Sequence, residues 1–500
     1  MAVDIPSHPG RRQPPVEAAS LDRARSSSRL GREGLLVLLV GGFTGLLFGL
    51  AGVLVSTDSW YALVGGRLIA RHGLPSHNTL TLWAHGARWV DEQWLAQLAF
   101  YGLDRAGGLR LAVFVHVLLL VGALTAAVAI ARRRGANSTS VAIVTAVALI
   151  PLVLSSAQLR TQSFGYILFV AVLALVTRPD PIGARCLAAL LAILVLWGNL
   201  HGSAALGAGL VSLRGVADVV STLRARRRPR LAWFVAVLPW AALLVTPYFL
   251  STAHYYGQTI FNSTLSHYLA QWQPSTLSVI SLPLFALAVG FIWLLGRAAP
   301  AYSGYEKVAG FVLVVFALLA VRNWVWLCLF AIALYPKALD RIRTPRRTAT
   351  ERRLNVVVGL AGIAVALLGA AVGLSRPQSG FARSFPAGAA RAVARVADAH
   401  PNARVWATEQ WTDWLMWQDP QLEGRMAFDA RVELLSEAQV KRMTVFSATA
   451  LLVPEVRRRY PILVVSKGNE PDAYRVLRRE GPVLYDDGNV LVVSTLKGSA

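Results

Sequence analysis

Long apolar segments recur along this chain of 500 residues, and they constrain its fold more than any other feature. A segment of about 20 apolar residues can cross a bilayer as a helix, which satisfies its backbone hydrogen bonds internally. Because 55% of the residues are hydrophobic and only 15% are charged, most of the chain is expected in a bilayer and a soluble enzyme is excluded. We predict a mostly α-helical, polytopic membrane protein.

The apolar pattern predicts about 11 transmembrane helices, several of them shorter than a full crossing requires. The segments are 35–55, 109–131, 141–155, 163–176, 186–198, 203–221, 231–248, 280–296, 308–321, 324–336 and 354–374. The outer tips of the short pairs are therefore expected to be recessed. Polar backbone at that depth is tolerated only beside protein or a water-filled cavity, so we predict an outward-facing cavity with a polar floor.

The charges in the connections support an odd number of spans. With the N-terminus in the cytoplasm, the inner connections carry clusters of Arg and Lys, whereas the short outer ones carry only Arg160 and Arg322. The positive-inside rule predicts this alternation, and an extra or missing span would invert it. We therefore predict a multi-pass protein of the cytoplasmic membrane. The net charge of +23 is accounted for by these clusters, so no nucleic acid partner is expected.

The chain divides into three parts. Residues 1–34 are rich in Pro, Ser and Arg and are expected to form a disordered cytoplasmic tail. Residues 35–374 form the membrane domain, which includes a long outer loop at 56–108. A third outer stretch, 249–279, has no charged side chain but several His, Tyr and Trp residues, so it is expected at the membrane interface. Residues 375–500 form an extracytoplasmic soluble domain.

The soluble domain has the pattern of a small α/β unit. Helices are predicted in "FPAGAARAVARVADAH", "LLSEAQVKRM" and "EPDAYRVLRRE". Strands are predicted in "RVWAT", "RMAFD" and "PILVVS", followed by the hairpin "VLYDDGNVLVVS". Strands that alternate with helices favour a mixed or parallel sheet with helices packed on it.

Ionisable residues near membrane depth are costly, so each one on the outer side is a candidate for function. They are Asp58, Asp91, Glu92, Arg160, His201 and Arg322. Arginine and a protonated histidine suit a phosphate group held against the membrane. A carboxylate suits a general base that acts on a hydroxyl group. Together they predict a transferase with a lipid-phosphate donor on the outer face.

Each candidate also has a structural interpretation. Asp58 could cap a helix that begins at Ser59, and Arg160 and Arg322 could be interfacial residues that extend to the lipid head groups. His201 could pack in a tight turn; no second ligand stands at a spacing suited to metal, so no metal site is predicted. In the soluble domain, four tryptophans could stack on sugars, but their spacing favours a packed helix face. They are Trp406, Trp411, Trp414 and Trp417.

Several pieces, in order, resemble the GT-C superfamily of membrane glycosyltransferases, which includes the protein O-mannosyltransferases and the lipid A aminoarabinose transferase. They are "TDSWYALVGGRLIARHGLPSHNTLTL", "WVDEQWLAQLAFYGLDRAGGL", "LRTQSFGYILF", "WGNLHGSAALG", "TPYF", "QWQPST" and "RMAFDARVELL". They cover nearly the whole chain and are most similar to an uncharacterised bacterial subgroup.

The resemblance implies transfer of a sugar, with inversion, from a polyprenyl-phosphate donor to a glycan, lipid or protein acceptor on the outer face. Asp58 matches the family's catalytic acid after the first span. Position makes Arg160, His201 and Arg322 the candidates for binding the donor phosphate. Candidate accessory residues are Trp60, Asp91, Glu92, Gln271 and Trp272.

Two departures from the family pattern bear on a metal cofactor. Many members have an Asp-Glu pair where this chain has Asp58 followed by Ser59, and related chains often have an acid at the position of Gln271. No cofactor is therefore predicted, although the resemblance leaves a divalent metal open. Two other functions also stay open: a transporter or flippase for a lipid-linked substrate, and a non-catalytic assembly protein of the cell envelope.

Overall fold

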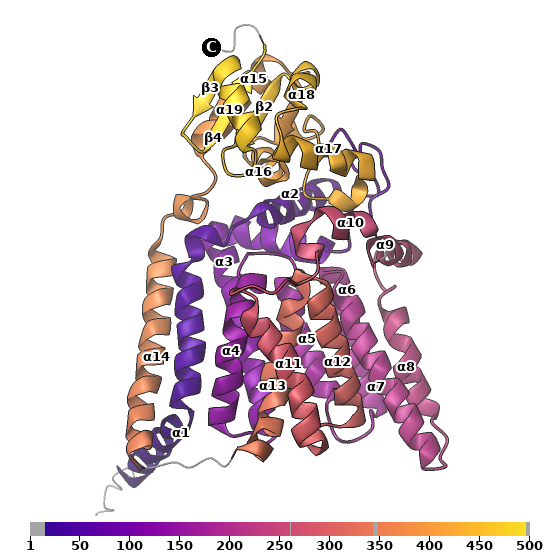
Figure 1. The fold of residues 1–500 in the computed structure, drawn as a ribbon, viewed down its shortest axis with the longest axis vertical. Helices are drawn as coiled ribbons and strands as arrows, with labels where there is room; N and C mark the ends of the chain where they lie inside the picture. The colour runs from indigo at the N-terminus through magenta and orange to yellow at the C-terminus, as the bar shows by residue number, and fades with distance from the viewer. Residues whose placement is uncertain (1–15, 261, 344–348, 497–500) are drawn as a thin grey trace, which may run out of the picture.

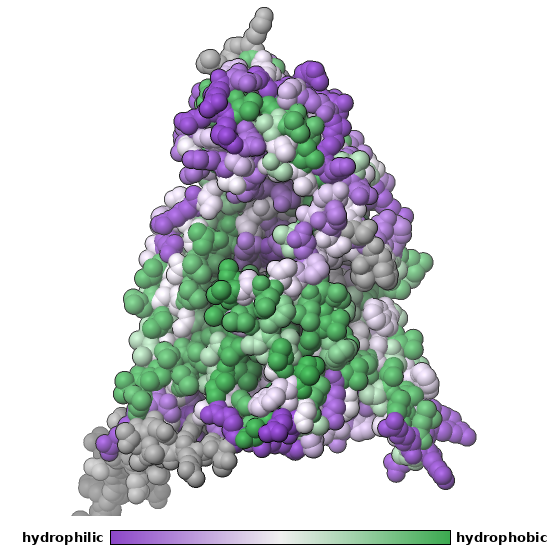
Figure 2. Space-filling model, viewed as in Figure 1, coloured by the Kyte–Doolittle hydropathy of each residue, from purple (hydrophilic) through white to green (hydrophobic). Residues whose placement is uncertain are grey.

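The computed structural model describes residues 16–260, 262–343 and 349–496. Figure 1 shows a bundle of helices with a small α/β domain at one end. Figure 2 shows an apolar belt around the bundle, between the hydrophilic α/β domain and a hydrophilic opposite end. This is the surface of a multi-pass membrane protein, because lipid tails cover the apolar belt.

Each apolar segment of the sequence lies largely within a helix of the bundle. These helices are α1 (Val16–Gly49), α3 (Trp94–Arg133), α4 (Ser138–Ser156), α5 (Ser163–Val176), α6 (Ala184–Leu200), α7 (Ala204–Arg224), α8 (Arg230–Ala242), α11 (Leu282–Ala298), α12 (Gly304–Leu319), α13 (Trp324–Ile342) and α14 (Ala349–Ser375). Among the described residues, 6 helices are long and apolar enough to cross a membrane. The mostly helical class is confirmed, and the number of 11 crossings stays a prediction.

The connections that carry basic clusters meet at one end of the bundle. Arg134, after α3, pairs with Glu306 at the start of α12 at 2.7 Å. Arg214 of α7 donates to the carbonyl oxygens of Val176 and Arg178, both at 2.7 Å, in the connection between α5 and α6. The first contact joins the connection after α3 to α12, and the second joins α7 to the end of α5 and the connection that follows it. The cytoplasmic location of this end stays a prediction.

Helix α1 packs closely along α14 because both helices carry glycines at their contact. A Cβ atom on Gly41 would lie 2.1 Å from the carbonyl oxygen of Gly362. Small residues allow helix backbones to approach in this way in membranes. Helix α1 begins at Val16, so residues 16–34 are helical and the prediction of a disordered tail is wrong for them. The Ala, Leu, Glu and Arg residues of this segment favour helix despite its lack of apolar periodicity. Residues 1–15 lie outside the described residues.

Four short helical segments lie at the rim of the bundle, beneath the α/β domain (Figure 1). Helix α2 (Thr57–His72) is buried over most of its length because α3 packs on one side and the α/β domain on the other. Helices α9 (Leu250–Ile260) and α10 (Ser263–Tyr268) and the 3-10 turn η2 (Ala270–Trp272) come from the uncharged stretch.

The α/β domain contains a mixed four-stranded sheet, as the sequence pattern predicts. The strands are β1 (Val405–Ala407), β2 (Ile462–Ser466), β3 (Val483–Asp486) and β4 (Val490–Ser494), in the order β1-β2-β4-β3. Strands β1 and β2 are parallel, whereas β4 pairs antiparallel with β2 and β3. Gly488, at a φ of 85°, makes the predicted hairpin turn between β3 and β4.

The strand predicted in "RMAFD" is not formed. This segment makes only isolated bridges, from Met426 to Val405 of β1 and to Thr81 of the outer loop. Gly424, at a φ of 78°, turns the chain just before it, so the extended stretch is too short for a ladder. It nevertheless joins the α/β domain to the outer loop. The remaining helices are α15 (Ala387–Ala399), α16 (Glu409–Gln418), α17 (Glu437–Ala448), α18 (Val453–Arg459) and α19 (Pro471–Glu480).

Candidate active site

The first turn of α2 positions Asp58 at the rim of the bundle. Ser56 is the N-cap residue, and its backbone N–H donates to the Ser59 hydroxyl oxygen at 2.9 Å. The helix therefore begins at Thr57, and Asp58 lies inside the first turn without serving as the cap. Its carboxylate is free to face another group, and 41% of the side chain is exposed.

Arg160 is the group that Asp58 faces. The connection between α4 and α5 is tied to α2 because the Ser59 hydroxyl donates to the Leu159 carbonyl at 2.7 Å. The Leu159 N–H also donates to the carbonyl of Leu54, at 2.8 Å. These bonds place Arg160 Nε 2.7 Å from Asp58 Oδ2. Arg160 thus turns inward to an acid and does not extend to the lipid surface.

The turn η2 brings a second arginine beside Arg160. Gln271 Oε1 accepts a hydrogen bond from Arg160 Nη1 at 2.8 Å. The next residue, Trp272, carries the Arg322 guanidinium over its ring at 4.2 Å from the centroid, a cation–π contact. Among the described residues, no carboxylate forms an ion pair with Arg322. Its charge is therefore available to a ligand.

His201 lies on the third predicted tip, directly after α6. The Ser203 N–H donates to His201 Nδ1 at 3.0 Å, so Nδ1 is an acceptor and the ring proton is on Nε2. Burial, followed by the positive charges of Arg322 and Arg160, lowers the pKa of His201 to about 3. The prediction of a cationic His201 is therefore replaced: the ring is neutral at physiological pH and offers an N–H donor.

The two acids of the outer loop differ in position. Glu92 accepts a hydrogen bond from the Tyr255 hydroxyl, and its pKa is raised to about 7 by burial and by the charge of Asp91. Asp91 is completely buried and accepts from Gln97 Nε2 at 2.9 Å. Burial raises the pKa of Asp91 to about 7. Neither acid forms a hydrogen bond or ion pair with Asp58 in the described part of the chain.

Glu92 lies against the tip that carries His201. A Cβ atom on Gly202 would be 3.4 Å from Glu92 Cγ and 3.2 Å from the Tyr255 hydroxyl oxygen. Trp60, the remaining accessory candidate, is only 1% exposed and packs edge-on against Phe385 at 5.3 Å. It belongs to the contact between α2 and the α/β domain and not to the site.

Two acids of the α/β domain, Glu409 and Glu433, lie near the candidate site and were not predicted from the sequence. Burial and then the charge of Asp58 raise the pKa of Glu409 to about 7, and burial and then Glu92 raise that of Glu433. Glu433 lies in "RMAFDARVELL" and Glu409 lies between Trp406 and Trp411, but neither acid was a candidate in the sequence analysis. Their proximity to Asp58 and Glu92 depends on how the domain docks.

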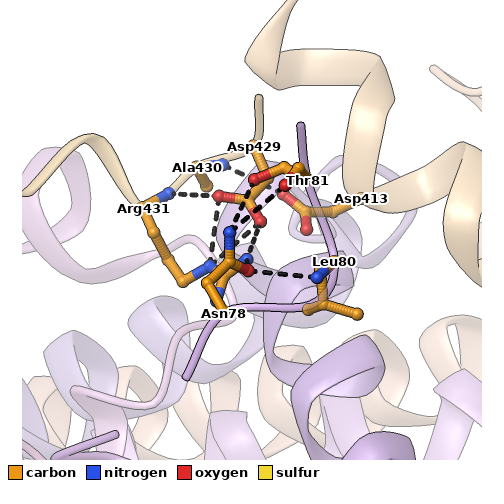
Figure 3. Close-up of polar contacts among 7 residues, drawn as sticks. All are labelled: Asn78, Leu80, Thr81, Asp413, Asp429, Ala430 and Arg431. Atoms are coloured by element: carbon orange, nitrogen blue, oxygen red, sulfur yellow. Dashed lines mark hydrogen bonds and ion pairs between the residues drawn. The ribbon is translucent and has the colours of Figure 1, made fainter. Parts of the chain in front are cut away.

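A buried network fixes this docking (Figure 3). Arg431 Nε lies 3.0 Å from Asp429 Oδ2, and Arg431 Nη2 donates to Asn78 Oδ1 of the outer loop at 2.7 Å. The same guanidinium lies over the Trp89 ring, 4.2 Å from its centroid. A second acid, Asp413, accepts from the Ala430 N–H at 3.3 Å. Burial and the charge of Asp429 raise the pKa of Asp413.

Figure 2 shows a hollow with hydrophilic side chains between the α/β domain and the apolar belt. Asp58, Arg160 and Arg322 lie at this level, because they occupy the ends of helices that face the domain. An arginine pair, a neutral imidazole and a carboxylate can bind a phosphate and accept a proton. In the described ranges, no three His, Cys, Asp or Glu side chains are grouped to hold a metal ion.

No family model and no curated protein matches the chain. Solved structures do. ArnT from Cupriavidus metallidurans in the apo state aligns with 92% of this chain and 98% of its own, at a TM-score of 0.50 and 16% identity. The oligosaccharyltransferase AglB from Archaeoglobus fulgidus, in complex with an inhibitory peptide and a dolichol-phosphate, aligns with 86% of this chain and 69% of its own, at 0.53 and 11%.

The arabinofuranosyltransferase AftD from Mycobacteria aligns with 88% of this chain, at a TM-score of 0.50 and 17% identity. The match covers only 37% of AftD. These three neighbours are GT-C glycosyltransferases, and the likeness extends over most of this chain. At such low identity it establishes the architecture alone. The chain therefore has the GT-C fold.

Proposed function

We propose that this protein is an integral-membrane glycosyltransferase that moves a sugar from a polyprenyl-phosphate donor to an acceptor on the outer face of the cytoplasmic membrane. The observation that carries the proposal is the ion pair between Asp58 and Arg160 in a GT-C fold, with Arg322 held on Trp272, next to the Gln271 that binds Arg160. The presence of dolichol-phosphate in the AglB structure supports a polyprenyl-phosphate donor.

Arg160 and Arg322 bind the donor phosphate in this proposal. Gln271 and Trp272 orient the two guanidinium groups, one by a hydrogen bond at 2.8 Å and one by ring contact at 4.2 Å. Guanidinium groups suit phosphate because they offer paired donors and keep their charge. His201 adds a neutral N–H donor. As the bond to the sugar breaks, these groups stabilise the negative charge that develops on the phosphate.

Asp58 acts as the general base. Its carboxylate takes the proton from the acceptor hydroxyl, whose oxygen attacks the anomeric carbon from the face opposite the phosphate. A bond forms between the acceptor oxygen and the sugar, the bond between sugar and phosphate breaks, and the configuration inverts. In the structure the Asp58 carboxylate is occupied by its ion pair with Arg160 at 2.7 Å. A donor phosphate that draws Arg160 away would therefore also free the base.

The proposal is tested with Asp58→Asn, expressed in a deletion strain of the source organism. We expect transfer to fall about 10²–10⁴-fold, because a general base typically contributes that factor. The readout is the glycan composition of the envelope by mass spectrometry. Binding of undecaprenyl phosphate to the purified variant should persist, since the arginines are intact. Asp104→Asn is the matched control, an acid of the same outer loop without a proposed role.

A wild-type glycan profile in the Asp58→Asn strain would refute the role of Asp58. The topology of the protein in the membrane is tested separately by a tag fused after residue 500. We expect intact cells to expose the tag, because the α/β domain and the hollow are proposed to be extracytoplasmic. A tag that becomes accessible only after lysis would overturn the outer-face site.

A further inference from the structure

A cavity of about 190 Å³ lies in the α/β domain, and its lining includes neither Asp58 nor Arg160, His201 or Arg322. It forms where the outer loop near Trp83 meets β1, α17 and α18. Its lining includes Trp83, Trp406, Gln439, Arg442, Glu455 and Tyr460. The Arg442 side chain is 43% exposed and the nearby Arg459 side chain is 64% exposed, so the cavity can be reached from solvent.

One side of this cavity is aromatic and held in place. The rings of Trp83 and Trp406 lie 5.5 Å apart, edge to face, and those of Trp406 and Tyr460 lie 5.4 Å apart. The Trp83 indole N–H donates to the Tyr460 hydroxyl oxygen at 2.7 Å. These contacts fix the rings before any ligand arrives, which reduces the entropy lost on binding.

The other side is polar and carries both donors and acceptors. Glu455 pairs with Arg442 and lies 3.9 Å from Arg459. Gln439 Nε2 donates to the Trp83 carbonyl at 3.1 Å. Trp406 packs behind Trp83 and Tyr460 and is only 2% exposed.

We propose that this cavity binds one neutral sugar unit of a glycan. A sugar ring presents C–H groups to an aromatic face and hydroxyls to side chains that donate and accept. A phosphate or other anion is disfavoured because the Glu455 carboxylate lies between the two arginines. At about 30 Å³ per water, the volume equals roughly six waters, which suits a single monosaccharide ring.

Two neighbouring tryptophans show how the packed alternative looks in the same domain. Trp411 and Trp414 contact Phe385 at 5.7 and 5.6 Å and are nearly inaccessible. They fill a core and line no cavity described here, so the sequence expectation of a packed face holds for them. Trp83 differs because it is only partly buried, and polar side chains and open volume lie beside it. The proposal of a sugar site depends on the proposed function in one respect: it takes the bound glycan to be the acceptor of the transfer.

The test is binding of labelled, full-length protein in lipid nanodiscs to an array of neutral oligosaccharides built from glucose, mannose, galactose or arabinose. Phosphorylated oligosaccharides on the same array distinguish an anion site. We expect wild type to bind a neutral member, and Arg442→Gln and Glu455→Gln to weaken that binding at least tenfold. Each variant must retain the wild-type unfolding temperature, and Trp83→Phe provides a further variant that keeps an aromatic ring.

Arg478→Gln is the matched control, since Arg478 pairs with Asp486 at 2.7 Å on α19, outside the cavity. It should bind as wild type does. Asp58→Asn should also keep full binding while transfer is lost, so failure of the transfer proposal and failure of the sugar site are distinguishable. The sugar site is overturned if only phosphorylated members bind, if no neutral member binds, or if the folded Arg442 and Glu455 variants bind as tightly as wild type.

Discussion

Arg431→Met tests whether the buried network is what docks the α/β domain on the outer loop. The side chain is 1% exposed and compensates Asp429, which is 3% exposed. Methionine has a similar length but leaves that carboxylate buried without its partner. Breaking a buried ion pair in this way costs about 3–5 kcal/mol. The loss includes the hydrogen bond to Asn78 and the stacking on Trp89.

For a domain of this size, 1 kcal/mol corresponds to roughly 3–5 °C in Tm, so Arg431→Met should lower the unfolding temperature by about 10–20 °C. The measurement is thermal unfolding of the full-length protein in detergent, followed by tryptophan fluorescence. Limited proteolysis should show earlier cleavage of the segment after α14.

The double variant Asp429→Asn/Arg431→Met separates the unpaired charge from the lost packing. It should recover most of the stability, since no ionised group is then left without a partner. Arg478→Met is the control: its ion pair with Asp486 is at the surface, with the Arg478 side chain 58% exposed, and should be worth less than about 1 kcal/mol. A single variant within about 1 kcal/mol of wild type, or a double variant no more stable than the single, would refute this reasoning.

Three further substitutions test individual contacts of the fold. Burial raises the pKa of Asp91 from 3.8 to about 7, so between these values the folded state binds more protons than the unfolded state, and wild type should lose up to about 4 kcal/mol of unfolding free energy as pH rises from 4 to 7. Asp91→Asn should remove this loss. Unfolding at pH 4.5 and 8 measures it, and equal pH dependence of both proteins would contradict it. Gly41→Val should cost about 1–3 kcal/mol, since its Cβ would meet the Gly362 carbonyl, whereas Gly42→Val, with open space, should be near neutral in the same melts. Ser59→Ala should cost about 1 kcal/mol of stability, because it removes the hydrogen bond that ties α2 to the connection carrying Arg160. If Arg160 binds the donor phosphate as proposed, transfer should also slow, and an unchanged initial rate would argue against that restraint.

Much of the architecture follows from local patterns. Apolar runs locate the helices, because lipid acts on each segment directly. The pattern failed where structure depends on partners. The "RMAFD" segment has the composition of a strand, but its neighbours allow only isolated bridges. Residues 16–34 are largely polar, yet they form the first part of α1, whose second half is apolar.

The residues of the candidate site were identifiable as ionisable groups on one side of the membrane, but their relations were not. The pairing of Asp58 with Arg160 depends on two hydrogen bonds of Leu159, about 100 residues away in the chain: its carbonyl accepts from Ser59 and its N–H donates to Leu54. Contacts between distant residues leave no periodic pattern in a sequence. For the same reason, the approach of Glu409 to Asp58 could not be predicted.

The sequence alone determined that the chain enters a membrane and which ionisable side chains are costly there, since both depend on the transfer of each residue between water and lipid. Tertiary structure decided which of those side chains meet. It showed that Ser56 caps α2 and leaves Asp58 to Arg160, and that His201 is neutral because two arginines and burial oppose its charge. Charge and basicity in a hollow are set by neighbours, and only the folded chain supplies them.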